Sequence, residues 1–173
     1  TVTCESIVTY IQTPEDTNFI IKALEMYSFV VCWGYSYEAL CNDDIIKFLI
    51  ENMHINNYSI QLLIFKSLTS IAKAPINEEI KALIIDSVFQ SRNLQDLASS
   101  CDNETILYYI ALFTEVSGFF FSSSQEMCTN FFQIALTFLV HPNKDISLSV
   151  ISFIRFYLKM DNDIMQVIRN NVL

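Results

Sequence analysis

The stretch HPNKDISLSVISFIRFYLKM, from His141 to Met160, decides the fold class. Pro142 ends one helical pattern, and Asn143-Lys144-Asp145 begins another, because Asn and Asp side chains accept hydrogen bonds from the unpaired amides at a helix start. The apolar residues that follow form a stripe at helical spacing: Ile146, Val150, Phe153, Ile154, Tyr157 and Leu158. Further apolar residues lie off this stripe: Leu148, Ile151 and Phe156. A helix with so much apolar circumference is expected to pack against neighbours on several sides.

The same pattern of a polar start and an apolar stripe runs through the rest of the chain. It predicts helices near residues 14–33, 43–53, 58–74, 78–89, 103–121, 125–141 and 144–160, with another beginning at residue 161. Residues 35–41 are expected to form a link or a single helical turn, and residues 92–101 a loop or a short helix. Only 2 Gly and 3 Pro occur, and no stretch alternates apolar and polar residues as a strand does. The sequence therefore predicts an all-α protein.

The longer helices recur at a regular interval. Their predicted starts lie about 43, 46 and 41 residues apart, which is close to the HEAT and armadillo period. Each longer helix is followed by a shorter one, so the predicted pairs cover residues 14–53, 57–91, 103–141 and 144–173, and residues 1–12 are the remnant of a preceding repeat. We expect one HEAT-like α-α superhelix (a solenoid) of about three and a half pairs. An irregular helical bundle is the alternative.

Charge limits the kinds of partner that suit this chain. Its formal net charge is −9, and 52% of its residues are hydrophobic, which argues against disorder. An acidic chain does not attract nucleic acid by its overall field, so RNA contact needs a local basic patch. The second helices of successive pairs commonly line one surface of a solenoid, and three basic residues could share it and face a ligand: Lys47, Lys81 and Arg92. Ordinary solvated surface is the alternative reading of these residues.

Residue types that carry chemistry do not form a recognisable motif. The chain has 5 Cys, an odd number with no C-x-x-C pair, so we expect buried reduced cysteines rather than disulfides. His54 and His141 lack the neighbouring ligands that a metal site needs. We therefore expect no enzyme activity, no cofactor and no metal. No signal peptide or stretch long enough to span a membrane is visible.

Aromatic residues are frequent, and two readings compete for them. Runs such as Phe119-Phe120-Phe121 could stack on bases, but stacking surfaces carry Lys and Arg nearby, whereas these flanks are neutral or acidic. We expect core packing instead. Trp33 is expected to be a packing anchor at a helix end.

Four stretches resemble the exportin-T family of the importin-β (karyopherin) superfamily. They are ALEMYSFVVCWGYSYEALCNDDIIKFLIENM at 23–53, LTSIAKAPINEEIKALIIDSVFQ at 68–90, LFTEVSGFF at 112–120 and LVHPNKDISLSVISFIRFYL at 139–158. The resemblance lies in the order and spacing of helices: a long helix ends in an aromatic residue, a short turn follows, and an Asn-Asp start begins the next helix. It covers most of residues 14–160.

The resemblance implies a non-catalytic nuclear export receptor. Such a receptor shuttles between nucleus and cytoplasm, contacts nuclear pore proteins, and binds tRNA together with Ran-GTP, each ligand strengthening the other. The alternative is a protein-binding HEAT scaffold from another karyopherin or an adaptor. The chain begins without Met and stops inside a helical pattern, so we expect a piece of a longer protein. Its cut ends are expected to expose apolar surface and to self-associate.

Overall fold

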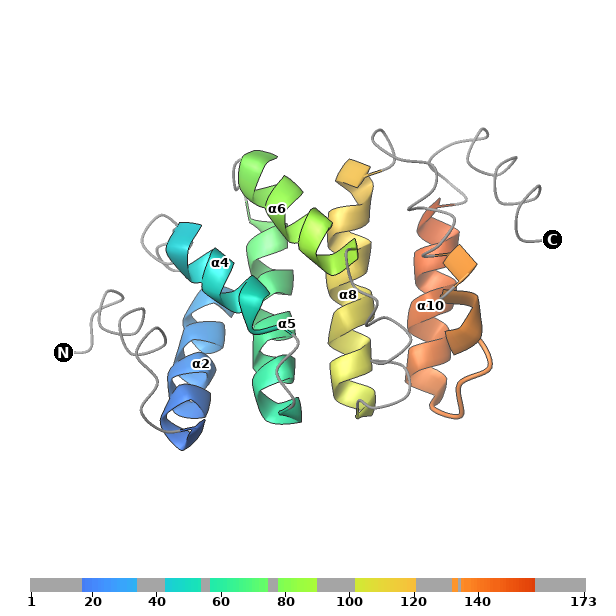
Figure 1. The fold of residues 1–173 in the computed structure, drawn as a ribbon. Coiled ribbons are helices and arrows are strands. Elements are labelled where there is room, and N and C mark those ends of the chain that lie inside the picture. The colour runs from blue at the N-terminus through green and yellow to red at the C-terminus, as the bar shows by residue number, and fades with distance from the viewer. Residues whose placement is uncertain are drawn as a thin grey trace. The chain divides into compact units, whose positions relative to one another are not determined.

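Every regular element described by the computed structural model is an α-helix. The structure describes residues 17–33, 43–53, 57–74, 78–89, 102–120, 132–133 and 135–157. The helices are α2 (Thr17–Cys32), α4 (Asp43–Glu51), α5 (Tyr58–Lys73), α6 (Glu78–Phe89), α8 (Asn103–Phe120) and α10 (Lys144–Tyr157) (Figure 1). Residues 132–133 and 135–138 are also helical. The all-α prediction is confirmed for this part of the chain.

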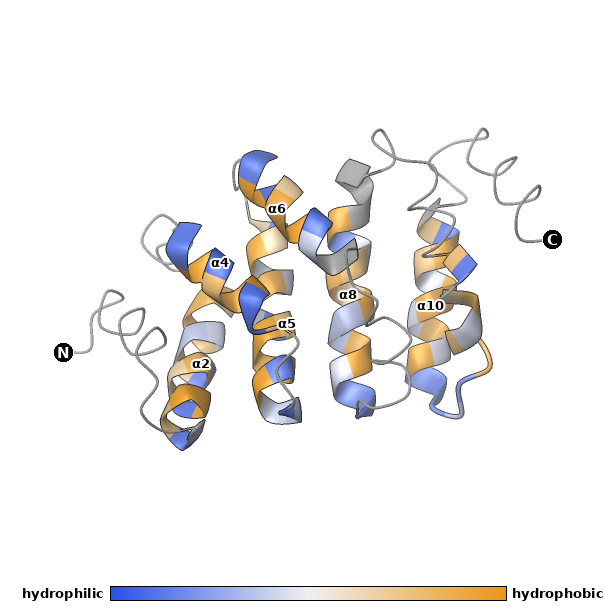
Figure 2. Cartoon of the chain, in the orientation of Figure 1, coloured by the Kyte–Doolittle hydropathy of each residue, from blue (hydrophilic) through white to orange (hydrophobic). Residues whose placement is uncertain are grey.

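Polar side chains determine where these helices begin. The Asn57 side chain accepts a hydrogen bond from the Ile60 amide (3.2 Å), and Asp102 accepts one from the Thr105 amide (2.9 Å). Each bond satisfies an amide that has no partner within its helix. Figure 2 accordingly shows hydrophilic residues in the first turns of α4, α6, α8 and α10, while apolar residues dominate the helix bodies.

The turn before α10 is held by hydrogen bonds from both sides. The Asn143 side chain accepts from the Asp145 amide (2.9 Å), while the Asn143 amide donates to Nδ1 of His141 (3.1 Å). The Ser147 hydroxyl reaches back to the carbonyl oxygen of His141 (3.1 Å). These bonds confirm the helix start that the opening stretch predicts.

The chain divides into two compact units, residues 1–88 and 89–173. In the first unit, α2 and α5 lie side by side and run in the same direction, and α4 packs against α5 (Figure 1). Their shared core contains fully buried apolar side chains from three helices: Leu24, Tyr27 and Val31 on α2, Ile45, Ile46 and Leu49 on α4, and Ile64, Phe65 and Leu68 on α5.

In the second unit, α8 packs beside α10. The buried ring of Phe153 on α10 contacts both α8 and the helical residues 132–133. It meets Phe113 of α8 edge-on, with ring centroids 5.6 Å apart, and Phe132 at 6.0 Å. Ile146 and Val150 complete the buried side of α10. Aromatic and aliphatic side chains therefore share the core of this unit, and its described ring contacts centre on Phe153.

Several apolar residues are more exposed than the sequence suggests. Trp33, expected as a packing anchor, is 65% exposed, and Phe19 at the other end of the same helix is 43% exposed. Cys32 is an exposed thiol rather than a buried one. For Trp33 and Phe19 the physical reason is that no helix in the described structure covers the side of α2 on which they lie. Cys32 lies on another side of α2, at the edge of the contact with α5, where its Sγ is 3.0 Å from Oγ of Ser70.

Other expectations lie outside the described residues. These are the helix beginning at residue 161, the link at 35–41, the segment at 92–101, and the side chains of Phe119, Phe120 and Phe121. The other four cysteines, Cys4, Cys41, Cys101 and Cys128, also lie there, as does His54.

Candidate functional site

The predicted basic residues do not form a concentrated patch. Lys47 is exposed on α4, whereas Lys81 on α6 is half-buried and pairs with Glu78, with Nζ 3.1 Å from Oε1. Arg92 lies outside the described residues. The pairing of Lys81 with a carboxylate reduces the positive charge that it offers to a phosphate.

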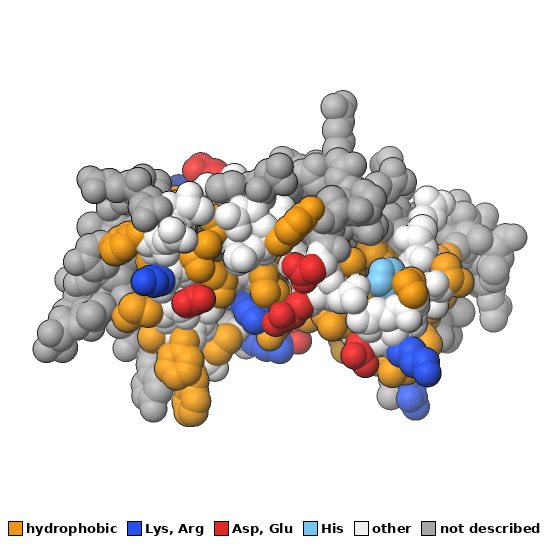
Figure 3. Space-filling view, turned by 90° about the horizontal axis from the view of Figure 1, so that it is seen from below, with side chains coloured by type: hydrophobic (Ala, Val, Ile, Leu, Met, Phe, Trp, Pro, Cys, Tyr) orange, Lys and Arg blue, Asp and Glu red, His pale blue; other side chains and the backbone are white. Residues whose placement is uncertain are grey.

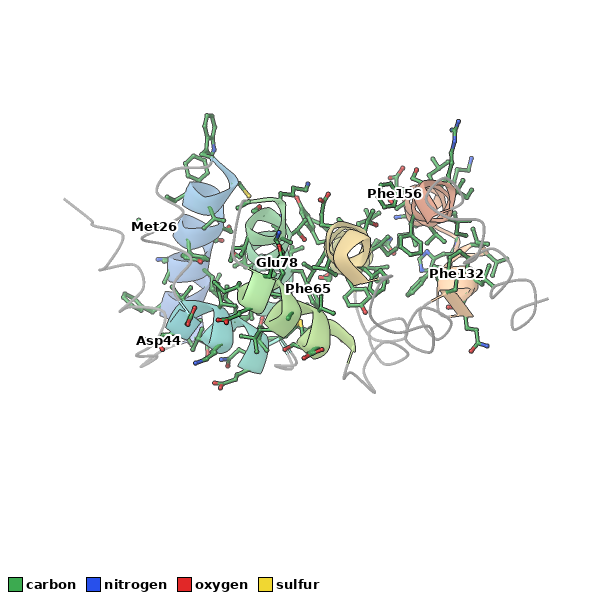
Figure 4. The ribbon with its side chains drawn as sticks, turned by 90° about the horizontal axis from the view of Figure 1, so that it is seen from above. Met26, Asp44, Phe65, Glu78, Phe132 and Phe156 are labelled. Atoms are coloured by element: carbon green, nitrogen blue, oxygen red, sulfur yellow. The ribbon has the colours of Figure 1, made fainter. Side chains whose placement is uncertain are left out.

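Acidic side chains dominate the exposed surface of these two helices. Exposed carboxylates surround Lys47 and Lys81: Asp43, Asp44 and Glu51 on α4, and Glu78, Glu79 and Asp86 on α6. Figure 4 labels Asp44 and Glu78 on these helices. On the underside of the molecule, Figure 3 shows acidic and basic side chains lying among apolar ones. In water and salt, phosphates are repelled by such a surface. The described parts of α4 and α6 are therefore poor candidates for an RNA site.

A stronger candidate surface is an apolar stripe on α2. It consists of Phe19, Met26, Phe29 and Trp33, which we call the α2 stripe, and its residues follow helical spacing on one side of the helix. Phe29 is 62% exposed, and its ring lies 5.6 Å from that of Trp33. Met26 points away from α5 (Figure 4). Large exposed apolar patches of this kind commonly mark interaction surfaces.

A second exposed face lies on α10. Leu148 is 58% exposed and Ile151 is 50% exposed, and Arg155 continues the same face one turn later. We call these three residues the α10 face. The sequence predicts that Leu148 and Ile151 are covered by neighbouring helices. Within the described structure they are not, because α8 packs on the opposite side, where Val150 and Phe153 lie.

Two titratable side chains in the described residues, His141 and Tyr109, belong to the turn before α10 and to the buried side of α8. His141 accepts a hydrogen bond in the turn before α10, and its ring lies 6.3 Å from that of Phe138. Burial raises the pKa of the Tyr109 hydroxyl far above its usual value. No group of three or more His, Cys, Asp or Glu side chains in the described ranges could hold a metal ion. Nor is any helix within those ranges both long and apolar enough to cross a membrane.

Comparisons with known proteins give a structural match only. No family model and no curated protein matches this chain. The crystal structure of an engineered protein, a target of the Northeast Structural Genomics Consortium, matches with a TM-score of 0.74 and 14% sequence identity. The match covers 97% of this chain and 67% of that one. At this identity the likeness shows the all-helical fold alone, and it fits a repeating arrangement of helices.

Sequence reasoning missed the α2 stripe for an identifiable reason. Both Tyr27 and Phe29 lie in an apolar helix, yet Tyr27 is completely buried while Phe29 is exposed. The spacing of Phe19, Met26, Phe29 and Trp33 was a usable signal, since they share one side of the helix and leave the buried residues on another. Hydropathy gave no indication of which side has a neighbour.

Proposed function

We propose that this chain is part of a non-catalytic HEAT-like helical array that binds macromolecular partners through helix faces. One observation carries the proposal: equivalent core positions of α2, α5 and α8 are buried in all three helices. The sequences of α2, α5 and α8 can be aligned so that Ser28, Thr69 and Thr114 correspond. Three sets of buried residues then share equivalent positions: Ala23 with Ile64 and Tyr109, Leu24 with Phe65 and Ile110, and Tyr27 with Leu68 and Phe113.

The aligned hydroxyl residues support the same equivalence. The side chains of Ser28, Thr69 and Thr114 each donate to a carbonyl oxygen in the preceding turn, at 3.1, 2.7 and 2.8 Å. A hydroxyl that satisfies itself in this way can lie within a helix contact without needing a partner across it. The buried positions recur at intervals of 41 residues (28 to 69) and 45 residues (69 to 114). Recurrence at nearly regular intervals is the expected result when each helix pair stacks on the next.

The narrower proposal follows the resemblance to the exportin-T family. In this form the array belongs to a nuclear export receptor that carries tRNA with Ran-GTP and shuttles between nucleus and cytoplasm. The acidic surfaces of α4 and α6 favour tRNA contacts in other parts of such a receptor, so we expect this segment to contribute architecture and protein contacts. A protein-binding scaffold from another karyopherin or an adaptor is the alternative, and the same acidic surfaces favour a basic protein partner.

The test is to titrate labelled tRNA against the full-length receptor with and without Ran-GTP. Coupled binding is expected to raise the tRNA affinity about fivefold or more when Ran-GTP is present, since coupling free energies are about 1–3 kcal/mol. The variant Lys47→Ala is expected to change the tRNA affinity by less than about twofold, because carboxylates surround this lysine. A matched control is Lys73→Ala, which removes the same charge from an exposed position on α5.

The possible outcomes separate the two forms of the proposal. If Ran-GTP leaves the tRNA affinity unchanged, the export-receptor form is wrong, while the helical array is unaffected. If Lys47→Ala alone lowers the tRNA affinity tenfold, then the α4 surface is an RNA site and our interpretation of its acidic residues fails.

A further inference from the structure

On α5, the positions that correspond to the α2 stripe lie on the side that contacts α2. In the alignment used above, Phe19, Met26, Phe29 and Trp33 correspond to Ile60, Ser67, Ser70 and Ala74. Ser70 contacts Cys32 of α2, with Oγ 3.0 Å from Sγ, and the other three share its side of α5 and are buried. On α5, therefore, this side receives the preceding long helix. On α2 the equivalent side is exposed.

The α10 face corresponds to the side of a long helix that contacts the next long helix. When α10 is aligned with α2 by their first residues, Lys144 and Thr17, the α10 face corresponds to Ile21, Leu24 and Ser28. These three residues lie with Cys32 on the side of α2 that faces α5. Leu24 and Ser28 are buried there. Thus the exposed side of α10 is the side with which α2 contacts α5, the next long helix. The exposed side of α2 is the side with which α5 contacts α2, the preceding long helix.

We propose that the α10 face of one chain packs on the α2 stripe of a second copy, in the same relationship that α2 has to α5. This inference rests on the helical-array part of the proposed function. The contact is head-to-tail, so different surfaces of the two copies meet, and it can be repeated along a row of chains. It specifies where the self-association expected from the sequence takes place.

The register of α2 on α5 also predicts which residues meet. Because Cys32 lies beside Ser70 and the two helices run in the same direction, Ser28 lies level with the turn that contains Lys66 and Ser67. Arg155 corresponds to Ser28, and the turn at Lys66 corresponds to the turn at Glu25 and Met26. The transferred register therefore places exposed Arg155 near exposed Glu25 of the second copy, and opposite charges there favour this pairing over others.

The exposed apolar area predicts a weak association. Aromatic side chains bury about 150–250 Å² each, so Phe29 and Trp33 together expose on the order of 250 Å². With Phe19, Met26, Leu148 and Ile151 added, the two surfaces offer on the order of 600 Å², below the roughly 1,000 Å² of a stable interface. Each copy also has a net charge of −9, which opposes contact unless salt screens it. We expect self-association only at protein concentrations of about 100 µM and above in about 0.15 M salt.

The test is sedimentation equilibrium of the 173-residue chain and two variants that each block one surface. Phe29→Asp with Trp33→Asp blocks the α2 stripe, and Ile151→Asp blocks the α10 face. All three side chains are at least half exposed, so helicity measured by circular dichroism should remain unchanged. We expect the wild type to form dimers and larger species, each variant alone to be monomeric, and an equimolar mixture of the two variants to form a dimer that grows no further.

Two further variants sharpen the test. Val140→Asp is the control, because Val140 is 87% exposed and apolar but belongs to neither surface, and it should self-associate like the wild type. Glu25→Arg should weaken the association at least fivefold, because the new arginine of one copy would lie near Arg155 of the other and the two positive charges repel. Adding Arg155→Glu to the same chain should restore most of the lost affinity, because the charges are then opposite again.

Several results would overturn the proposal. A wild type that stays monomeric at about 1 mM means that the α2 stripe is covered within the chain. Loss of association in the α2 variant but not in Ile151→Asp means that two α2 stripes pair symmetrically. A mixture of the variants that remains monomeric excludes a head-to-tail contact, and failure of the charge exchange excludes the register. None of these results affects the tRNA and Ran-GTP test, so the two proposals can fail separately.

Discussion

The aromatic core of the second unit offers a sharp test of packing, because two phenylalanines on α10 differ mainly in burial. Phe153 is 1% exposed and contacts the rings of Phe113 and Phe132, whereas Phe156 is 41% exposed. Replacing each with Ala removes the same atoms from the same helix. The pair therefore separates the cost of losing core contacts from the small effects of the substitution on helix propensity.

The expected magnitudes differ by at least about 2 kcal/mol. Phe153→Ala leaves a cavity among three helical segments and should cost about 3–5 kcal/mol. About 0.5–1.5 kcal/mol of that cost comes from each aromatic pair beyond simple area burial. Phe156→Ala removes a partly hydrated ring and leaves a site that water can enter, so its cost should be about 1 kcal/mol.

Urea denaturation followed by circular dichroism at 222 nm measures the difference. With a denaturant slope of about 1–3 kcal/mol per molar, the Phe153→Ala midpoint should fall by at least about 1 M, and that of Phe156→Ala by much less. Measurements at low micromolar protein concentration exclude any contribution from self-association. Equal shifts for the two variants would refute the assignment of Phe153 to the core that joins α8 with α10.

Two further predictions concern a helix start and a buried hydroxyl. Asn57→Ala should destabilise the first unit by about 1 kcal/mol, because the Ile60 amide loses its acceptor, and Asn57→Ser should recover most of the loss in the same urea experiment. The raised pKa of Tyr109 should make the second unit lose stability above about pH 10 by up to about 1.4 kcal/mol per pH unit, because the unfolded tyrosine then releases a proton that the folded one retains. Urea midpoints measured from pH 8 to 11 should show a shallower decline for Tyr109→Phe than for the wild type; parallel declines would mean that another group causes the alkaline loss.

The sequence predicts helix starts well because capping is a local interaction. Asn57, Asp102 and Asn143 each bond to amides within three residues, so their role can be read from the adjacent residues. Helix type is also local, since apolar spacing over a few turns distinguishes a helix from a strand. These features required no knowledge of the rest of the chain.

The candidate surfaces could be predicted only in part. The sequence identified α10 as apolar on several sides, and it identified Lys47 and Lys81 as residues on second helices. It did not reveal that Lys81 pairs with Glu78, although their spacing on one helix made this pairing possible. It also assigned Trp33 to the core, because a hydrophobicity pattern does not distinguish an exposed side from one that contacts a neighbour.

The sequence by itself determined the all-α class and the positions of most described helices. Tertiary structure alone decided that Tyr27 on α2 is buried while Phe29, on the same helix, is exposed. The physical reason is that helix formation depends on bonds between residues four apart, whereas burial depends on which distant segment packs against each side. The α2 stripe and the α10 face follow from that second choice.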